Sequence, residues 1–154
     1  MTGEKRIEIR WRDVDALGHV NNAVYATYLE DARDEWMTQA LGSEESLWDY
    51  VLARVAIDFR RELRYEEGEV LVRTSLARIG TSSLTLRAEI VSRAGWVAAE
   101  TESVIVARDR DTGRPRPLTG AERASFESVL TLAENACPSS AVRSTTSRDT
   151  GRSS

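Results

Sequence analysis

The stretch NAVYATYLEDARDEWMTQAL, residues 22–41, carries the clearest periodicity in the chain. Apolar side chains recur at intervals of three and four residues, and acidic side chains fill the other side. This spacing predicts one long helix with a single buried face, in which the aromatic residues belong to the core. Gly42 follows directly and is the expected end of the helix. The apolar positions are Tyr25, Tyr28, Leu29, Ala32, Trp36 and Ala40, and the acidic positions are Glu30, Asp31, Asp34 and Glu35.

The segments on both sides of this helix alternate with a period of two. In residues 5–12, Ile7, Ile9 and Trp11 alternate with charged neighbours, which predicts a half-buried strand. Residues 43–48 indicate a short second helix. Four more alternating stretches follow between about residues 53 and 108, separated by turn sequences around residues 66–68, 80 and 94–95. One strand, one long helix and four consecutive strands predict an α+β fold, with the helix laid across an antiparallel sheet.

The C-terminal part of the chain divides into a short helix and a polar tail. Thr119 and Glu122 form a capping-box pattern, which predicts a helix over residues 120–133. Residues 134–154 are rich in Ser, Thr and Arg and have almost nothing to bury, so we expect them to be disordered, with Cys137 inert. The sequence therefore predicts one domain over residues 1–133 and a tail over residues 134–154.

Composition excludes several classes of function. The 154 residues carry a net charge of −4, which argues against a general nucleic-acid binder. One Cys and one His exclude an internal disulfide and an ordinary His/Cys zinc site, and we expect no metal and no cofactor. No apolar run comes near the roughly 20 residues of a membrane span, and no apolar signal core follows the N-terminus. A reduced, cytoplasmic compartment is the expected location.

The loop DVDALGHVNN, residues 13–22, is the one place where chemistry gathers. No Gly-x-Ser-x-Gly elbow, Walker loop or Gly-x-Gly-x-x-Gly motif occurs in the sequence. Unpaired N–H groups at the start of the helix can hold the oxyanion of an acyl-transfer reaction. An aspartate a few residues earlier can act as general base or nucleophile. The loop therefore permits thioester or ester hydrolysis without a metal or a triad.

Structural interpretations of the same residues stay open. Aspartates and paired asparagines before a helix are common turn and cap residues, and a lone histidine is often structural. Asp13 is expected to face outward or to bond locally. The arginines at positions 60, 61 and 64 could hold a phosphate, but the acidic residues around them favour a solvated face of mixed charge.

The run from Asp15 to Asn22, followed by Tyr25, Tyr28, Glu30, Ala32 and Arg33, resembles the hot-dog acyl thioesterases, specifically the 4-hydroxybenzoyl-CoA thioesterase type with a loop shared by acyl-ACP thioesterases. The resemblance covers about residues 5–130. Residues 80–84, the hairpin at 94–95 and the stretch 109–117 support it. It implies a five-stranded antiparallel sheet wrapped around one long central helix, and hydrolysis of an acyl-CoA or acyl-ACP thioester.

The resemblance also implies roles for individual residues. Asp15 matches the catalytic carboxylate, Asn22 stands where the oxyanion N–H is donated, and Gly18 matches a glycine that lets the substrate carbonyl approach. Asn22 and Trp11 depart from the His and Tyr of some bacterial relatives, which bears on the substrate class. The residues expected to bind substrate are His19, Val20, Asn21, Tyr25, Ser82 and Ser83, with the two serines contributed by a neighbouring subunit.

A homodimer or homotetramer is expected for two reasons. The family places its active sites at subunit interfaces, and the strands carry more apolar surface than one helix can cover. The strand residues behind this expectation are Val70, Leu71, Val72, Leu84, Leu86, Val104 and Val106.

Two alternative functions compete for the same residues. A non-catalytic acyl-CoA-binding hot-dog module would use the same loop. A hot-dog enoyl hydratase or dehydratase ranks below it, because those enzymes resemble an Asp-x-Asn-Pro-x-His pattern. Here His19 is four residues after Asp15, not five, and the Asn and Pro of that pattern are missing.

Overall fold

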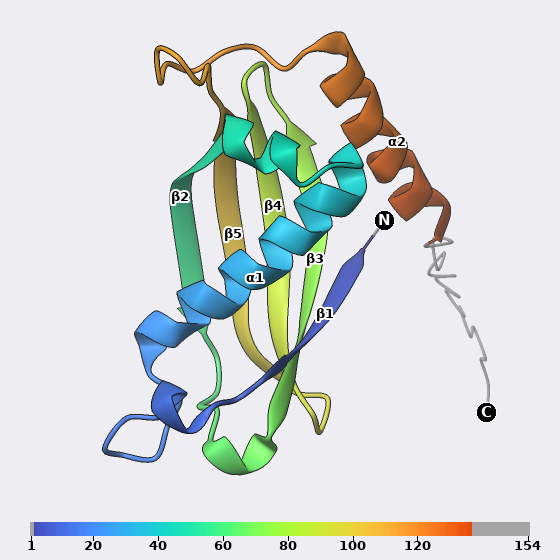
Figure 1. Ribbon diagram of the computed structural model, residues 1–154. Coiled ribbons are helices and arrows are strands. Elements are labelled where there is room, and N and C mark those ends of the chain that lie inside the picture. Colours follow the sequence, from blue (N-terminus) through green and yellow to red (C-terminus); the bar gives the residue numbers. More distant parts are fainter. Residues whose placement is uncertain (1, 137–154) are drawn as a thin grey trace, which may run out of the picture.

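The computed structural model describes residues 2–136. One strand is followed by a long helix, four strands and a second long helix, in the predicted order (Figure 1). The strands are β1 (Gly3–Glu8), β2 (Tyr50–Phe59), β3 (Glu69–Ile79), β4 (Ser83–Ser92) and β5 (Val97–Ala107). The helices are α1 (Asn22–Leu41) and α2 (Gly120–Ala136), with 3-10 turns η1 (Trp11–Asp13), η2 (Glu45–Asp49) and η3 (Tyr65–Glu67).

The five strands form one antiparallel sheet in the order β1-β3-β4-β5-β2. α1 runs diagonally across one face of this sheet, and α2 packs near one end of it (Figure 1). This arrangement confirms the predicted α+β hot-dog fold. Because β2 pairs only with β5, its other edge presents unpaired backbone groups to its surroundings.

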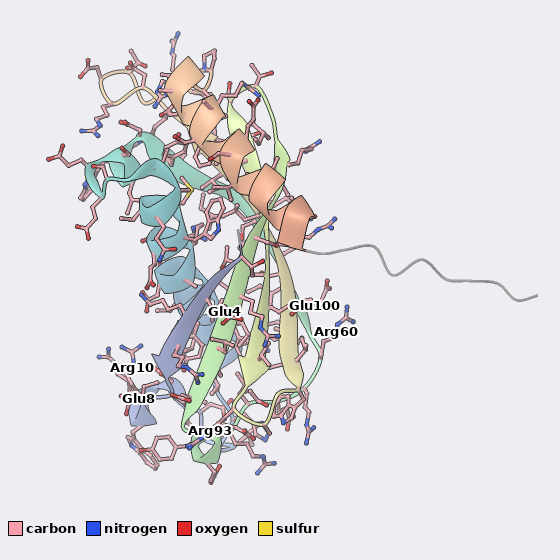
Figure 2. All side chains as sticks on the ribbon, turned by 90° about the vertical axis from the view of Figure 1, so that its right-hand side faces the viewer. Glu4, Glu8, Arg10, Arg60, Arg93 and Glu100 are labelled. Atoms are coloured by element: carbon pink, nitrogen blue, oxygen red, sulfur yellow. The ribbon has the colours of Figure 1, made fainter. Side chains whose placement is uncertain are left out.

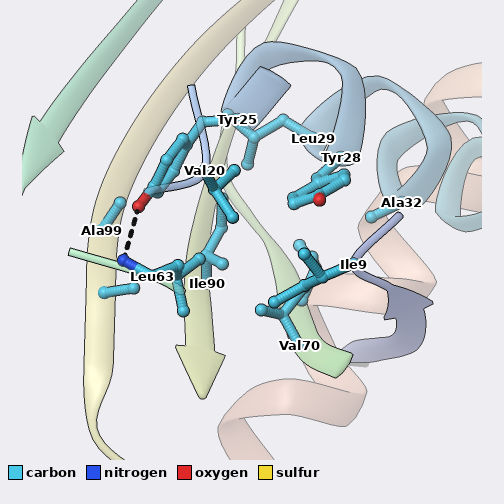
Figure 3. Close-up of a cluster of buried hydrophobic side chains, with 12 residues drawn as sticks. Ile9, Val20, Tyr25, Tyr28, Leu29, Ala32, Leu63, Val70, Ile90 and Ala99 are labelled. Atoms are coloured by element: carbon cyan, nitrogen blue, oxygen red, sulfur yellow. Dashed lines mark hydrogen bonds between the residues drawn. The ribbon is translucent and has the colours of Figure 1, made fainter. Parts of the chain in front are cut away.

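α1 has the predicted bounds and the predicted ends. The Asn21 side chain accepts a hydrogen bond from the Ala23 N–H at 2.9 Å, which caps the N-terminus. Gly42 ends the helix with a left-handed φ of 75°, a conformation that favours glycine. The aromatic positions Tyr25 and Tyr28 are buried against β1, β3, β4 and β5 (Figure 3), which confirms them as core residues.

A second hydrophobic cluster joins the end of α1 to α2. Trp36 stacks on Phe126 with ring centroids 6.4 Å apart, and both side chains are buried. The predicted capping box is confirmed, since Thr119 and Glu122 each donate a backbone N–H to the side chain of the other. α2 continues to Ala136, three residues beyond its predicted end. The rest of the predicted tail, including Cys137, lies outside the described residues.

Glu122 also ties α2 to the segment before it, and this link predicts a pH-dependent stability. The Arg116 guanidinium donates two hydrogen bonds to the Glu122 carboxylate, at 2.8 and 2.9 Å. These bonds, against partial burial, hold the pKa of Glu122 at about 2 rather than 4.5. Glu122→Gln should therefore lower the free energy of unfolding at neutral pH by about 2 kcal/mol.

The sign follows from linkage. A carboxylate with a lowered pKa stabilises the fold above its unfolded pKa and loses that contribution as the pH falls. The difference between wild type and Glu122→Gln in urea denaturation should be complete at about pH 6 and shrink between pH 4.5 and 2. Glu66→Gln, a change of an exposed glutamate on η3, is the control. Equal destabilisation by Glu122→Gln at both ends of this range would contradict the assignment.

The outer face of the sheet is not the apolar surface that we expected to drive assembly. This face is charged, with ion pairs such as Arg73 to Glu4 at 3.1 Å and Arg60 to Glu100 at 2.6 Å. Figure 2 shows Glu100 and Arg60 on the side of the sheet opposite α1. The apolar strand residues are mostly covered: Val70, Val72, Leu84 and Leu86 are buried in the two clusters, whereas Leu71, Val104 and Val106 are half-buried.

Uncovered apolar surface lies instead along the edge strand β2. Leu52, Val55 and Phe59 are 44%, 38% and 47% exposed. Each pairs with a buried residue of β5, so all three side chains point to the helix side of the sheet. An edge strand has a neighbour on one side only, which is why residues with a core-like pattern stay exposed here.

The first strand is shorter than predicted. β1 ends at Glu8, and the chain turns into η1, so Trp11 is 78% exposed rather than half-buried. Arg10 and Asp13 cause the turn, because the Asp13 carboxylate accepts the Arg10 N–H at 2.9 Å. Alternation alone does not reveal this local capping interaction.

Candidate active site

A pocket of about 500 Å³ lies between the loop that precedes α1 and the end of β2. The loop supplies one wall, and residues 59–62 supply the other. The lining residues are Asp15, Leu17, His19, Val20, Asn21, Asn22, Tyr25, Phe59, Arg60, Arg61 and Glu62. The structure therefore brings together six of the predicted site residues and adds a second wall that the sequence did not predict.

The loop is a small hairpin closed by its own backbone. The Asn21 N–H donates to the Asp13 carbonyl at 2.9 Å, and the Asp15 N–H donates to the His19 carbonyl at 2.8 Å. Gly18 has a φ of 80° at the tip, and a Cβ there would meet no atom within 4 Å. The backbone conformation is thus the reason for glycine at this position in the chain. Its predicted role toward the substrate carbonyl stays a prediction.

The Asp15 carboxylate is held by one oxygen only. Its Oδ1 accepts the backbone N–H groups of Leu17 at 2.8 Å and His19 at 3.2 Å. Its Oδ2 accepts no hydrogen bond from any residue between 2 and 136. The loop therefore fixes the carboxylate while one oxygen remains available to a ligand in the pocket.

At the start of α1, two backbone N–H groups have an acceptor in the described chain and one has none. The Ala23 N–H donates to the Asn21 side chain, and the Val24 N–H donates to the Asn21 carbonyl at 2.8 Å. Within the described part of the chain, the N–H of Asn22, the first helical residue, has no acceptor. Asn21 is thus the cap that leaves one N–H free at the positive end of the helix. The predicted role of the Asn22 N–H as oxyanion donor stays a prediction.

His19 joins the two walls of the pocket. Its Nε2 lies 3.1 Å from Glu62 Oε2, and its backbone forms a β-bridge with Arg64. Sequence reasoning assigned His19 to the loop but placed Glu62 on a solvated face. The pairing joins residues 43 positions apart, and nothing in the local pattern signals it.

Two predicted binding residues are mainly structural in their contacts. Val20 is 3% exposed, and its N–H donates to the Leu63 carbonyl at 2.8 Å. The Leu63 N–H donates to the Tyr25 hydroxyl at 3.4 Å (Figure 3), and burial raises the pKa of Tyr25. The Tyr25 ring also meets Phe59 edge-on, with centroids 5.0 Å apart. Val20 and Tyr25 form the floor of the pocket, and the loop supplies the polar groups that face a ligand.

The arginines beside the pocket behave largely as the sequence predicts. Arg60 is paired with Glu100, and the Arg61 guanidinium lies 4.3 Å from the centroid of the Trp96 ring. Together with Glu62, which pairs with His19 of the loop, they form a face of mixed charge rather than a basic patch.

Ser82 and Ser83 lie away from this pocket in the same chain. Ser83 begins β4. Ser92, at the other end of β4, pairs with Val70 at the end of the sheet that holds the loop. The ten-residue strand therefore separates Ser83 from the end of the sheet with the pocket by about 30 Å, at 3.3 Å per residue. The predicted contribution of these serines concerns a neighbouring subunit and stays a prediction.

Asp13 differs from the expectation of an outward-facing residue. It is 2% exposed, and its Oδ2 accepts the Arg10 N–H at 2.9 Å and the Tyr28 hydroxyl at 2.8 Å. Burial acts to raise the pKa of Asp13, but these hydrogen bonds outweigh burial and lower it. The expectation of local bonding is right and that of exposure is wrong, because Tyr28 reaches Asp13 from α1.

Neither a metal cluster nor a membrane-spanning helix is found in residues 2–136. No group of three or more His, Cys, Asp or Glu side chains there could hold a metal ion. No helix in that range is long and apolar enough to cross a membrane.

Comparison with known proteins agrees with the fold. Residues 9–131 match the model of the thioesterase-like superfamily. A thioesterase from Thermus thermophilus, solved in complex with coenzyme A and Zn, is 32% identical. The match covers 84% of this chain and 94% of that one, with a TM-score of 0.76. A predicted thioesterase from Bacillus stearothermophilus is 31% identical over 84% and 96% of the two chains, also with a TM-score of 0.76.

A further relative is known from sequence. The uncharacterized protein YsmA of Bacillus subtilis is 32% identical over 83 residues, which are 53% of this chain and 55% of that protein. The match thus spans about half the length of that relative.

The fold and the family match together define a hot-dog protein of the thioesterase class. The chain belongs to the thioesterase-like superfamily. The similar solved structures from Thermus thermophilus and Bacillus stearothermophilus are likewise described as thioesterases.

Proposed function

We propose that this enzyme hydrolyses an acyl-CoA thioester, with Asp15 as general base or nucleophile and the Asn22 N–H as oxyanion donor. One observation carries the proposal: Asp15 and Asn22 line the same pocket, and the described chain leaves one carboxylate oxygen of Asp15 and the N–H of Asn22 without partners. A base or nucleophile beside an oxyanion donor is the minimum that acyl transfer requires.

The chemistry needs no further charged group at the carbonyl. In the general-base route, Asp15 takes a proton from water as its oxygen attacks the thioester carbon. The carbonyl oxygen becomes an oxyanion, which the Asn22 N–H and the helix terminus stabilise. The C–S bond then breaks, and the departing thiolate takes up the proton from Asp15. In the nucleophilic route, an Asp15 oxygen attacks the thioester carbon, the C–S bond breaks and the thiolate leaves, which gives an anhydride between Asp15 and the acyl group. Water then hydrolyses the anhydride, which releases the acid, regenerates the Asp15 carboxylate and supplies the proton that the thiolate takes up. The oxyanion of each step is held in the same place.

His19 is best explained as a residue that shapes the pocket. Its pairing with Glu62 ties the loop to the segment after β2, and its side chain is 21% exposed. A thiolate is a good leaving group, so the reaction does not depend on a strong general acid. His19, Val20, Asn21 and Tyr25 then bind substrate by forming the walls around the acyl group and the thiol arm.

A second copy of the chain would complete this pocket. β2 has one free edge, and its side chains toward the helix are the exposed Leu52, Val55 and Phe59. Antiparallel pairing of two β2 edges about a two-fold axis would continue the sheet and cover these side chains. It would also place the start of one β2 beside the end of the other.

This pairing accounts for the predicted role of the serines. Val51, at the start of β2, is in register with Val106 of β5, which is in register with Ser83. The Ser82–Ser83 end of one subunit would therefore approach the pocket at Phe59 of its partner. We propose a homodimer, alone or within a homotetramer, whose two sites are each shared between subunits.

CoA is the carrier that the pocket rim favours over an acyl carrier protein. A carrier protein needs a continuous complementary surface of roughly 800 Å² on each partner. Here Arg60 and Arg61 already contact Glu100 and Trp96, and Glu62 adds a negative charge to the same pocket. CoA, with its narrow thiol arm and few phosphates, needs a smaller complementary surface than a carrier protein does. The single Cys of the chain suits a reduced, cytoplasmic setting.

The test is a panel of short, long and aromatic acyl-CoAs and one acyl carrier protein thioester, with release of free thiol as the readout. Turnover of at least one acyl-CoA, with saturation, is the expected result. Faster turnover of the carrier-protein substrate would overturn the choice of carrier. Saturable binding without thiol release would favour the non-catalytic acyl-binding module instead.

A further inference from the structure

A buried polar contact joins the root of the active-site loop to the middle of the first half of α1. The Tyr28 hydroxyl donates to Asp13 Oδ2 at 2.8 Å, and the two residues are 0% and 2% exposed. The same oxygen accepts the Arg10 N–H at 2.9 Å and the Arg10 Nε at 3.3 Å. Neither Asp13 nor Tyr28 lines the pocket, so neither can touch a substrate there.

The chain connectivity places Asp13 at the point from which both reacting groups extend. Asp15 follows it by two residues. The Asp13 carbonyl accepts the N–H of Asn21 at 2.9 Å, and Asn22 is the next residue. Asn22 begins α1, so a displacement of Asp13 relative to α1 changes the position of the Asp15 carboxylate relative to the Asn22 N–H.

Simple capping of η1 does not explain the contact with α1. The bonds from the Arg10 N–H and Nε to Asp13 Oδ2 already close the turn without Tyr28. The tyrosine hydroxyl adds a directional bond that selects one position of the loop root along α1, which packing of apolar side chains alone would specify less sharply. Burial together with the bond to Asp13 raises the pKa of Tyr28, so its hydroxyl stays a donor over the working pH range.

We propose that Asp13 and Tyr28 are positioning residues, and that their hydrogen bond sets the distance between the Asp15 carboxylate and the Asn22 N–H. This inference rests on the proposed function of those two groups. Loss of the Tyr28 hydroxyl leaves unchanged the pocket walls that would contact the acyl group and the thiol arm. The pair of Asp13 and Tyr28 should therefore affect the chemical step and not the affinity for substrate.

Tyr28→Phe tests the proposal with the smallest change. It removes one hydroxyl and leaves the ring, the Asp13 carboxylate and both Arg10 contacts in place. The expected result is a fall in kcat of about tenfold or more with KM within about twofold, since misplacement of reacting groups by less than about 1 Å lowers the rate steeply. Hydrogen exchange of backbone amides in residues 14–22 should be faster than in the wild type.

Two further variants separate positioning from general destabilisation. Phe126→Leu changes a buried residue in the other hydrophobic cluster and should lower the melting temperature while leaving kcat and loop exchange unchanged. Asp13→Ala removes the acceptor of the same bond, so its kcat should fall at least as far as that of Tyr28→Phe. The double variant of Asp13→Ala and Tyr28→Phe should be no slower than Asp13→Ala, because the Tyr28 hydroxyl then has no bond to Asp13 left to lose.

These variants distinguish failure of the positioning role from failure of the proposed function. If Asp15→Asn is inactive while Tyr28→Phe retains the kcat of the wild type, the positioning role is wrong and the proposed function stands. If Asp15→Asn is fully active, the proposed site is wrong. If Phe126→Leu loses kcat as much as Tyr28→Phe at equal loss of melting temperature, the effect is one of stability and the positioning role is also wrong.

Discussion

Asp15→Asn is expected to lower kcat on the best thioester substrate by at least about 100-fold, the usual scale for loss of a general base or nucleophile. The amide keeps an oxygen that can accept the N–H groups of Leu17 and His19, so the hairpin should hold its shape. What is lost is the second carboxylate oxygen, which the described chain leaves without a partner. KM should change little, because the walls of the pocket remain.

Asp109→Asn is the matched control for this experiment. Asp109 is also a turn aspartate, and its Oδ1 accepts the N–H groups of Asp111 at 3.1 Å and Thr112 at 2.8 Å. The same substitution there should cost some stability and leave kcat unchanged. Asp13 is unsuitable as a control, since it is buried and bonded to Tyr28. Hydrolysis by Asp15→Asn at the rate of the wild type would contradict the catalytic assignment.

Val55→Glu is expected to separate the subunits and to reduce kcat/KM by at least about 100-fold, because each site would lose the groups that its partner positions. Val55 lies in the middle of β2, is 38% exposed and points to the helix side. On a two-fold axis a new carboxylate meets its own copy, so like charges oppose each other across the interface. Light scattering at the assay concentration should change from a dimer or tetramer to a 17.2 kDa species.

Val104→Glu provides the comparison on the neighbouring strand. Val104 pairs with Arg54 and points to the charged outer face, where a carboxylate would find opposite charges. That variant should keep both its assembly and its activity. An active 17.2 kDa species, in either variant or in the wild type, would show that one chain is sufficient and would remove the shared site from the proposal.

Elements with strong local periodicity were predictable from sequence. α1 has the predicted bounds because its apolar stripe, the Asn21 cap and the Gly42 end all act within a few residues. The capping box at Thr119 and Glu122 is local in the same way. β1 ends early because the contact between Arg10 and Asp13 competes with the alternating pattern, and periodicity carries no signal for such a contact.

The candidate site was predictable on one side only. The loop from Asp15 to Asn22 holds the proposed base, the cap and the free N–H within eight residues, so their proximity follows from sequence. Glu62 reaches His19 across 43 positions, and the second wall exists only because β2 ends beside the start of α1. No pattern within residues 59–62 distinguishes a pocket wall from a solvated turn.

The sequence by itself determined the α+β class, the central helix and the loop that carries the proposed reacting groups, since each depends on residues close together in the chain. Only the tertiary structure decided that Asp13 is buried under Tyr28, that the outer face of the sheet is charged, and that exposed apolar side chains line the edge strand β2. These features depend on strand order and register. A strand at the edge and a strand in the centre can have the same alternating pattern, and only the pairing of the whole sheet determines which one lacks a neighbour.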